Sequence, residues 1–187
     1  MGLIGHNGGP SVEEGATWRR HCWTAARAAL LPTLPIEVVR LRVRRAQELG
    51  LDYQTYAGVR AASGHDVVAF LYSSNALRVS PDSLRMPEGR AVKLARVKAE
   101  RIGLAQGRIA LAPMTAVNPE LDRVGMPPAL LARFGEAGRQ LREILGRLPG
   151  DRVILVGDMG LERDWCAAGR LACYLDAQRY FGADTAV

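Results

Sequence analysis

The chain has 187 residues, a formal net charge of +6, and 48% hydrophobic and 24% charged side chains, a composition typical of one globular domain with its own core. No stretch approaches the roughly 20 apolar residues of a membrane span, and the amino terminus lacks the basic and apolar segments of a secretory signal. We therefore expect a cytoplasmic protein with no membrane association.

Charge divides unevenly along the chain. Residues 1–105 carry 15 basic and 9 acidic side chains, a net of +6, whereas residues 106–187 carry 10 of each. Because a basic surface attracts polyanions, this asymmetry predicts a polyanionic partner for the amino-terminal half.

The cysteines do not indicate a metal site. Cys22, Cys166 and Cys173 have no Cys-x-x-Cys spacing, and we expect free, mostly buried thiols in a reducing compartment. Phosphate-loop, nucleophile-elbow and zinc-protease motifs do not occur in the sequence. The sequence therefore predicts neither a metal nor a cofactor.

The amino-terminal part is expected to be a flexible tail followed by a basic helical region. Residues 1–16 contain five glycines and little to bury, which predicts a flexible tail. Within it, Ile4-Gly5-His6-Asn7-Gly8-Gly9 resembles a short leader of small phage-like and bacterial proteins. Residues 17–78 form the basic helical region, with helices expected over about 17–31, 35–49 and 53–62.

The middle of the chain changes character several times. The apolar run at residues 66–73 fits a buried strand or a short helix, and its β-branched start favours the strand. Turn-forming residues predict a linker at 79–89. Downstream, the patterns predict a helix over about 90–102, a short strand over 108–112, and a long helix that follows Pro127-Pro128 and ends near Leu148.

The last third has the clearest pattern. Val153 to Val156 are all apolar, which is typical of a buried parallel strand. A tight loop follows at residues 157–160, and Asp164 is expected to cap a final helix over about 165–178. We predict a helix-rich α/β fold: an amino-terminal helical part, then an α/β region (90–187) with a short, mostly parallel sheet, compact with residues 17–78.

The segment from Ala46 to Ala62 resembles the helix-turn-helix of transcription regulators. Ala46 matches the small residue that permits close helix crossing, and Gly50 matches the glycine of the turn. Thr55 and Tyr56 match the early positions of the second helix. The alternative is an ordinary helical hairpin with Gly50 as its cap.

The resemblance implies DNA binding by two groups of side chains. Those of the first helix would contact phosphates, and those of the second would lie toward the major groove. The expected nucleic-acid-binding residues are Arg40, Arg44, Arg45, Gln54, Thr55 and Arg60.

Two other segments resemble motifs of haloacid-dehalogenase-type phosphatases. The run from Val67 to Tyr72 ends in Ser73-Ser74-Asn75, like a strand whose Ser or Thr holds a phosphoryl oxygen. Val153 to Val156 ends in Gly157-Asp158, like the strand whose acidic residues hold Mg²⁺. The resemblance implies a phosphate or metal site made of Ser74, Asp158 and Glu162, with Lys98 or Lys93 on the phosphate.

The chain departs from that family at the decisive position. The family's first strand ends in Asp-x-Asp, whose first Asp is the covalent nucleophile, and no such pair occurs here. The alternative for Asp158 is a loop carboxylate that caps the last helix and balances Arg163 or Arg170.

These patterns favour a nucleic-acid-associated regulatory or accessory protein without catalysis, which contacts the polyanion through its amino-terminal half. A haloacid-dehalogenase-like, possibly degenerate, phosphate-handling protein is the second hypothesis. A protein-interaction subunit, which would use the alanine-rich helix faces, is the third.

Overall fold

A computed structural model describes residues 34–129 and 131–182 of the chain. The expected tail at 1–16 and the expected helix at 17–31 lie outside this part. Contacts divide the chain into two units, residues 1–39 and 40–187. The fold and the site described below belong to the second unit, which also contains the predicted linker at 79–89.

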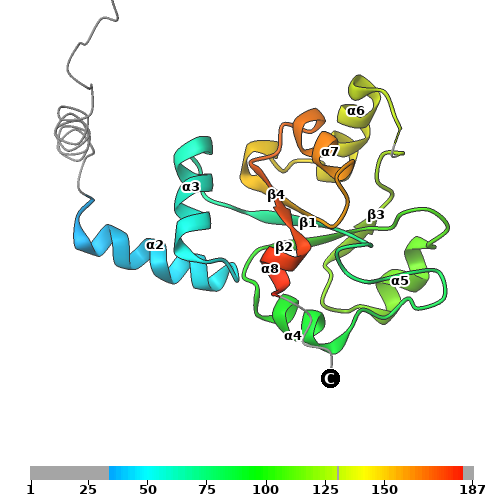
Figure 1. Cartoon of the computed structure of the whole chain (residues 1–187), viewed down its shortest axis with the longest axis horizontal. Coiled ribbons are helices and arrows are strands. Elements are labelled where there is room, and N and C mark those ends of the chain that lie inside the picture. Colours follow the sequence, from blue (N-terminus) through cyan, green and yellow to red (C-terminus); the bar gives the residue numbers. More distant parts are fainter. Residues whose placement is uncertain (1–33, 130, 183–187) are drawn as a thin grey trace, which may run out of the picture. The chain divides into compact units, whose positions relative to one another are not determined.

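Five parallel strands form one sheet in the order β3-β2-β1-β4-β5 (Figure 1). The central strand β1 pairs with β2 on one side and β4 on the other, and a helix joins each consecutive pair because parallel strands need a crossover. The strands are β1 (Ala69–Ser73), β2 (Glu100–Leu104), β3 (Arg123–Gly125), β4 (Val153–Gly157) and β5 (Cys173–Asp176).

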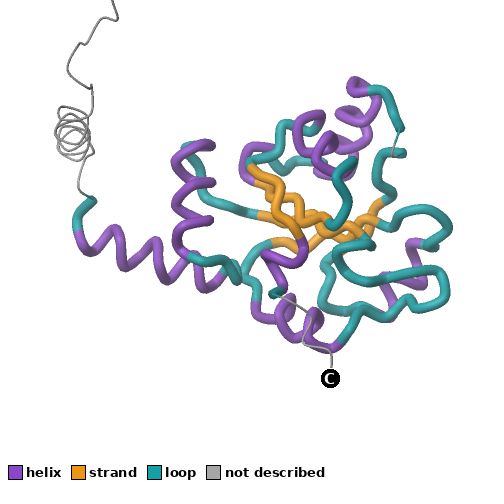
Figure 2. The backbone as a smooth tube through the Cα atoms, in the orientation of Figure 1, coloured by secondary structure: helices purple, strands orange, loops and turns teal. Residues whose placement is uncertain are grey.

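Helices cover both faces of the sheet (Figures 1 and 2). Helices α4 and α5 lie on one face and α6 and α7 on the other, so the predicted helix-rich α/β class is confirmed. Within the described residues the helices are α2 (Ile36–Glu48), α3 (Tyr53–Ser63), α4 (Glu88–Arg96), α5 (Leu111–Val117), α6 (Phe134–Leu145), α7 (Glu162–Ala168) and α8 (Ala177–Phe181), with a 3-10 turn at Gly150–Arg152.

The apolar run of β1 follows from its position between two cores. Phe70 and Tyr72 belong to the core that includes α4 and α8, whereas Ala69 and Leu71 belong to the core of α6 and α7. Because side chains alternate along a strand, a strand covered on both faces is apolar at every position. The same reasoning holds for β4, and both strands occur where the sequence predicted them.

The structure corrects three other predicted elements. The helix expected over 90–102 ends at Arg96, and its last residues belong to β2. The strand expected over 108–112 is a loop that runs into α5. The final helix expected over 165–178 is instead α7, β5 and the start of α8.

Short strands with polar positions explain these differences. β2 begins with Glu100 and Arg101, which pair with Arg123 and Asp122, so it lacks the apolar start of β1.

The long helix expected after Pro128 begins only at Phe134. Asp164 lies inside α7, and Leu161 is the residue that precedes the helix, so the predicted Asp164 cap is wrong.

Close packing between α6 and α7 gives a testable prediction. A Cβ atom at Gly138 would lie 2.7 Å from the Ala168 carbonyl oxygen, whereas a Cβ at Gly135 of the same helix meets nothing within 4 Å. We expect Gly138→Ala to lower the free energy of unfolding by about 1 to 3 kcal/mol through overpacking. Gly135→Ala should leave it unchanged or raise it by about 0.5 kcal/mol through helix propensity. Urea unfolding of both variants measures the difference, and equal effects would contradict the described α6–α7 contact.

Candidate functional site

The carboxyl ends of β1, β2 and β4 meet at the point where the strand order reverses. In open parallel sheets, ligands bind outside the carboxyl ends of the strands at such a switch point. Three side chains donate hydrogen bonds to one carboxylate there, that of Glu162. The Ser73 hydroxyl donates over 3.1 Å, the Asn75 amide over 3.1 Å and the Gln106 amide over 2.7 Å.

Two backbone groups complete the surroundings of this carboxylate. The N–H groups of Asp158 and Met159 donate to Glu162 Oε2 over 2.8 and 3.2 Å. Glu162 is 0% exposed, so the carboxylate lies inside a cage of five donors. Donors of this kind also hold bound anions in proteins. The protein's own carboxylate therefore fills the place that a phosphoryl group would need.

The residues predicted for a phosphate or metal site are only partly brought together. Ser74, Asp158 and Glu162 lie in the same group of loops: Gln106 N donates to Ser74 Oγ over 3.3 Å, and the Gln106 side chain reaches Glu162. Lys98 lies apart, before the amino end of β2, where it pairs with Glu48 at 3.1 Å. In residues 34–129 and 131–182, no three His, Cys, Asp or Glu residues are grouped to hold a metal ion.

The Asp158 side chain pairs with Arg78 at 2.6 Å, rather than with Arg163 or Arg170. Arg78 has a φ of +54°, a backbone conformation that is costly for a residue with a Cβ. β1 is the first strand of the described sheet, and it ends in Ser73-Ser74-Asn75, which carry hydroxyl and amide side chains.

Sequence reasoning missed Gln106. It follows β2, a strand that was predicted as helix, so no signal placed it beside the ends of β1 and β4. Asn75 was identified as part of a motif, but its bond to Glu162 depends on the pairing of β1 with β4.

The helix-turn-helix-like segment has the predicted turn. Gly50 has a φ of +66°, Ala46 is buried, and Asp52 caps α3 through the backbone N–H of Thr55 at 2.8 Å. Thr55 itself is buried, and its hydroxyl accepts a hydrogen bond from Arg179 over 2.8 Å. Thr55 is therefore engaged within the protein rather than turned toward a groove.

Arg45 is also engaged internally. Its guanidinium donates to the Asp66 carboxylate and to the Val67 carbonyl oxygen, both over 2.9 Å. Arg40, Arg44 and Gln54 are exposed and Arg60 is half-exposed. The remaining exposed positions of α3 are occupied by small residues, namely Gly58, Ala61 and Ala62.

Ion pairs between the two halves of the chain change the charge distribution that was predicted from the sequence. Several basic residues of the first 105 positions pair with carboxylates from the second part of the chain. These pairs are Arg78–Asp158, Arg85–Glu120 and Arg101–Asp122. Because these carboxylates neutralise amino-terminal arginines, arginines of the formally neutral part are left without carboxylate partners.

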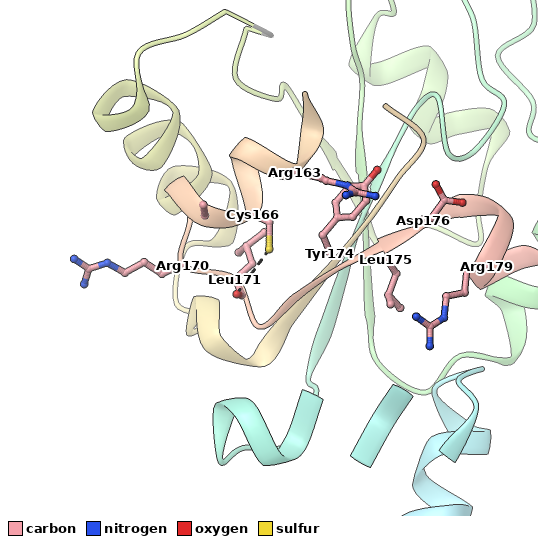
Figure 3. A pocket seen from close by; sticks show the side chains of 9 residues that line it. Arg163, Cys166, Arg170, Leu171, Tyr174, Leu175, Asp176 and Arg179 are labelled. Atoms are coloured by element: carbon pink, nitrogen blue, oxygen red, sulfur yellow. Dashed lines mark hydrogen bonds between the residues drawn. The ribbon is translucent and has the colours of Figure 1, made fainter. Parts of the chain in front are cut away.

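Three such arginines surround a hollow beside β5, the edge strand of the sheet (Figure 3). This β5 hollow has a volume of about 520 Å³ and is lined by Arg163, Arg170, Arg179, Tyr174 and Asp176, among others. Within the described residues none of the three arginines forms an ion pair with a carboxylate. In Figure 3, Arg163 lies against Tyr174, while Arg170 and Arg179 point away on either side.

The hollow also contains a thiol. Cys166 and Cys173 are free, and they lie on α7 and β5 rather than on one helix. Burial raises the pKa of Cys166 to about 11, so its thiol is protonated near neutral pH. A protonated thiol is a poor nucleophile.

The fold defines the chain as an open, all-parallel α/β protein with helices on both faces of its sheet. No protein-family model matches the chain, and no curated protein or solved structure shows significant similarity to it. Among the helices of residues 34–129 and 131–182, none is long and apolar enough to cross a membrane.

Proposed function

We propose that this protein binds nucleic acid through the β5 hollow, as an accessory or regulatory protein without catalysis. The observation that carries the proposal is the group of three arginines, Arg163, Arg170 and Arg179, which line one hollow and have no carboxylate partners in the described part of the chain. Three arginines against one carboxylate, that of Asp176, give the lining of the hollow a net positive charge, and positive charge in a concave site raises the local concentration of anions.

The spread of the three arginines favours a polymer over a small anion. A compact phosphate group is held by guanidinium groups that converge on it, whereas Arg170 and Arg179 point away from Tyr174 on opposite sides (Figure 3). Successive phosphates of one strand can meet such a row of separated charges. The arrangement therefore fits the backbone of a nucleic acid.

Two features argue against an enzyme at the carboxyl edge of the sheet. Glu162 fills the cage of donors at the switch point, and its burial leaves no space there for a phosphoryl group. The ion pair between Arg78 and Asp158 engages the carboxylate that a metal would need. The phosphate-handling hypothesis thus lacks both a vacant anion site and a nucleophile.

The helix-turn-helix-like segment has a smaller part in this proposal than the sequence suggested. Arg179 joins the β5 hollow to α3 through its bond to Thr55, so the exposed Gln54 is expected to lie near the bound strand. Arg40, Arg44 and Arg60 are expected to add contacts with phosphates. Arg45 and Thr55 are not expected to contact the nucleic acid, because their polar groups already form hydrogen bonds within the protein.

Arg170→Gly is the sharpest test, because its effects on binding and on stability should be opposite. Arg170 has a φ of +52°, so glycine should keep or raise the free energy of unfolding by up to about 1 kcal/mol. Loss of one phosphate contact should weaken oligonucleotide binding several-fold at low salt. It should also reduce the slope of log K against log salt concentration by about the amount that one phosphate contact contributes. Fluorescence anisotropy with a labelled 12-nucleotide strand, repeated at several salt concentrations, measures both quantities.

Arg108→Ala is the matched control. Arg108 is exposed in the loop after β2, and β2 is separated from β5 by β1 and β4. The control removes the same charge but should change binding much less than Arg170→Gly. Equal losses in the two variants would show that net charge, and not the β5 hollow, attracts the strand.

A further inference from the structure

We infer that the nucleic acid bound at the β5 hollow is single-stranded, with one unpaired base stacked on the guanidinium of Arg163. This inference rests on the proposed function and names its substrate class. It is carried by the contact between Arg163 and Tyr174, which a purely electrostatic site would not need.

Arg163 and Tyr174 form a platform in which the guanidinium lies against the aromatic ring (Figure 3). The Arg163 guanidinium carbon lies 5.2 Å from the centre of the Tyr174 ring. The ring is fixed from behind, because its hydroxyl donates to the Met159 carbonyl oxygen over 3.2 Å and a Cβ at Gly157 would lie 2.6 Å from its edge. Arg163 is exposed. Guanidinium planes and aromatic rings are the surfaces on which unpaired bases stack.

The size and lining of the β5 hollow suit one base and its sugar. Its volume of about 520 Å³ falls within the range of roughly 300 to 1,000 Å³ for sites that hold small molecules. Leu171 and Leu175 contribute apolar surface to the lining, and a base offers an apolar face in return. In a duplex the faces of the bases are covered by their neighbours, so a duplex could not use this platform.

The positions of the other two arginines match the phosphates of such a strand. In Figure 3 the platform lies between Arg170 on one side and Arg179 on the other. A strand that places a base on Arg163 would carry phosphates toward both. The α3 surface offers few polar groups to read a duplex, because three of its exposed residues, Gly58, Ala61 and Ala62, carry no side-chain donor or acceptor for base edges in a major groove.

The test compares the full chain with the variant Arg163→Lys, which keeps the charge and removes the planar group. Four fluorescein-labelled probes are used at one salt concentration: 12-nucleotide oligothymidylate, 12-nucleotide oligouridylate, a 12-base-pair duplex, and an abasic deoxyribose-phosphate strand of equal charge. We expect the unmodified protein to bind both single strands about 5- to 100-fold more tightly than the abasic strand, and more tightly than the duplex. Arg163→Lys should remove the preference over the abasic strand while the salt dependence stays unchanged.

Each alternative result is informative. Equal binding of the base-containing and abasic strands, or tighter binding of the duplex, overturns the single-strand inference and leaves nucleic-acid binding intact. Unchanged binding by Arg163→Lys overturns the stacking role of Arg163. Absence of binding to all four probes overturns the proposed function itself. Tyr174→Leu provides a second variant, which is expected to lower the preference for base-containing strands over the abasic strand. Circular dichroism checks that both variants fold.

Discussion

Replacing Glu162 with alanine is expected to lower the free energy of unfolding by about 3 kcal/mol or more. The substitution removes the acceptor of five hydrogen bonds, which come from Ser73, Asn75, Gln106 and the backbone of Asp158 and Met159. Each buried donor left without a partner costs roughly 1 to 3 kcal/mol, and water entering the gap offsets part of this cost. Urea unfolding followed by tryptophan fluorescence measures the change.

Two further variants define the origin of the effect. Glu162→Gln keeps the shape but turns an amide N–H₂ toward some of the donors, so we expect an intermediate loss of about 1 to 2 kcal/mol. Glu143→Ala removes an exposed carboxylate from α6 and should change stability by less than about 0.5 kcal/mol. If Glu162→Ala lowered the free energy of unfolding as little as Glu143→Ala, the carboxylate would not hold the three strand ends together. Glu162 would then give no reason to exclude an anion site at this place.

Nucleic-acid binding by Glu162→Gln is expected to match that of the unmodified protein. Neither Glu162 nor its side-chain donors line the β5 hollow, although the cage and the hollow meet at Met159, whose N–H donates to Glu162 and whose carbonyl oxygen accepts from Tyr174. The cage stabilises the sheet from which the hollow is built, and the arginines supply the charge.

The sequence predicted those elements whose pattern depends on burial alone. β1 and β4 were identified because both faces of each strand are covered, which leaves an uninterrupted apolar run. α2, α3 and the Gly50 turn were identified because capping by Asp52 and a positive φ at Gly50 are local properties. β2, β3 and β5 were missed because three to five residues with charged ends give too little pattern, and their pairing is decided by neighbours distant in the chain.

The candidate site was harder to predict, because it depends on which charges meet. Counting residues along the chain placed the basic surface in the first 105 residues. The ion pairs Arg85–Glu120 and Arg101–Asp122 show why this count misleads: carboxylates from one half neutralise arginines from the other. The arginines that remain at the β5 hollow belong to a half whose formal charge is zero.

Raising the pH above 9 is expected to destabilise the protein, because burial raises the pKa of several thiol and hydroxyl groups, among them Cys166, Cys173, Tyr72 and Tyr180. Burial raises the pKa of the Cys166 thiol from 9 to about 11, and burial raises the pKa of the Tyr180 hydroxyl from 10 to about 12. In the unfolded chain both groups ionise near their usual values, so the unfolded state loses protons first. The stabilisation is thus fully present below pH 9 and is lost as the pH rises through 9 to 11 for Cys166 and through 10 to 12 for Tyr180.

The expected loss at pH 11 is about 2 kcal/mol from Cys166 and about 1 kcal/mol from Tyr180. Urea unfolding at intervals between pH 8 and 11, with a reductant present, measures it. Cys166→Ala should reduce the loss of stability from pH 9 upward, whereas Tyr180→Phe should reduce it only above pH 10. At neutral pH, Tyr180→Phe should also cost about 1 kcal/mol, because its hydroxyl contacts Tyr72 and donates to the Leu49 carbonyl oxygen. A profile that both variants leave unchanged would show that neither group is buried as described, and a Cys166 thiol that ionises near pH 9 would reopen the β5 hollow to chemistry as well as binding.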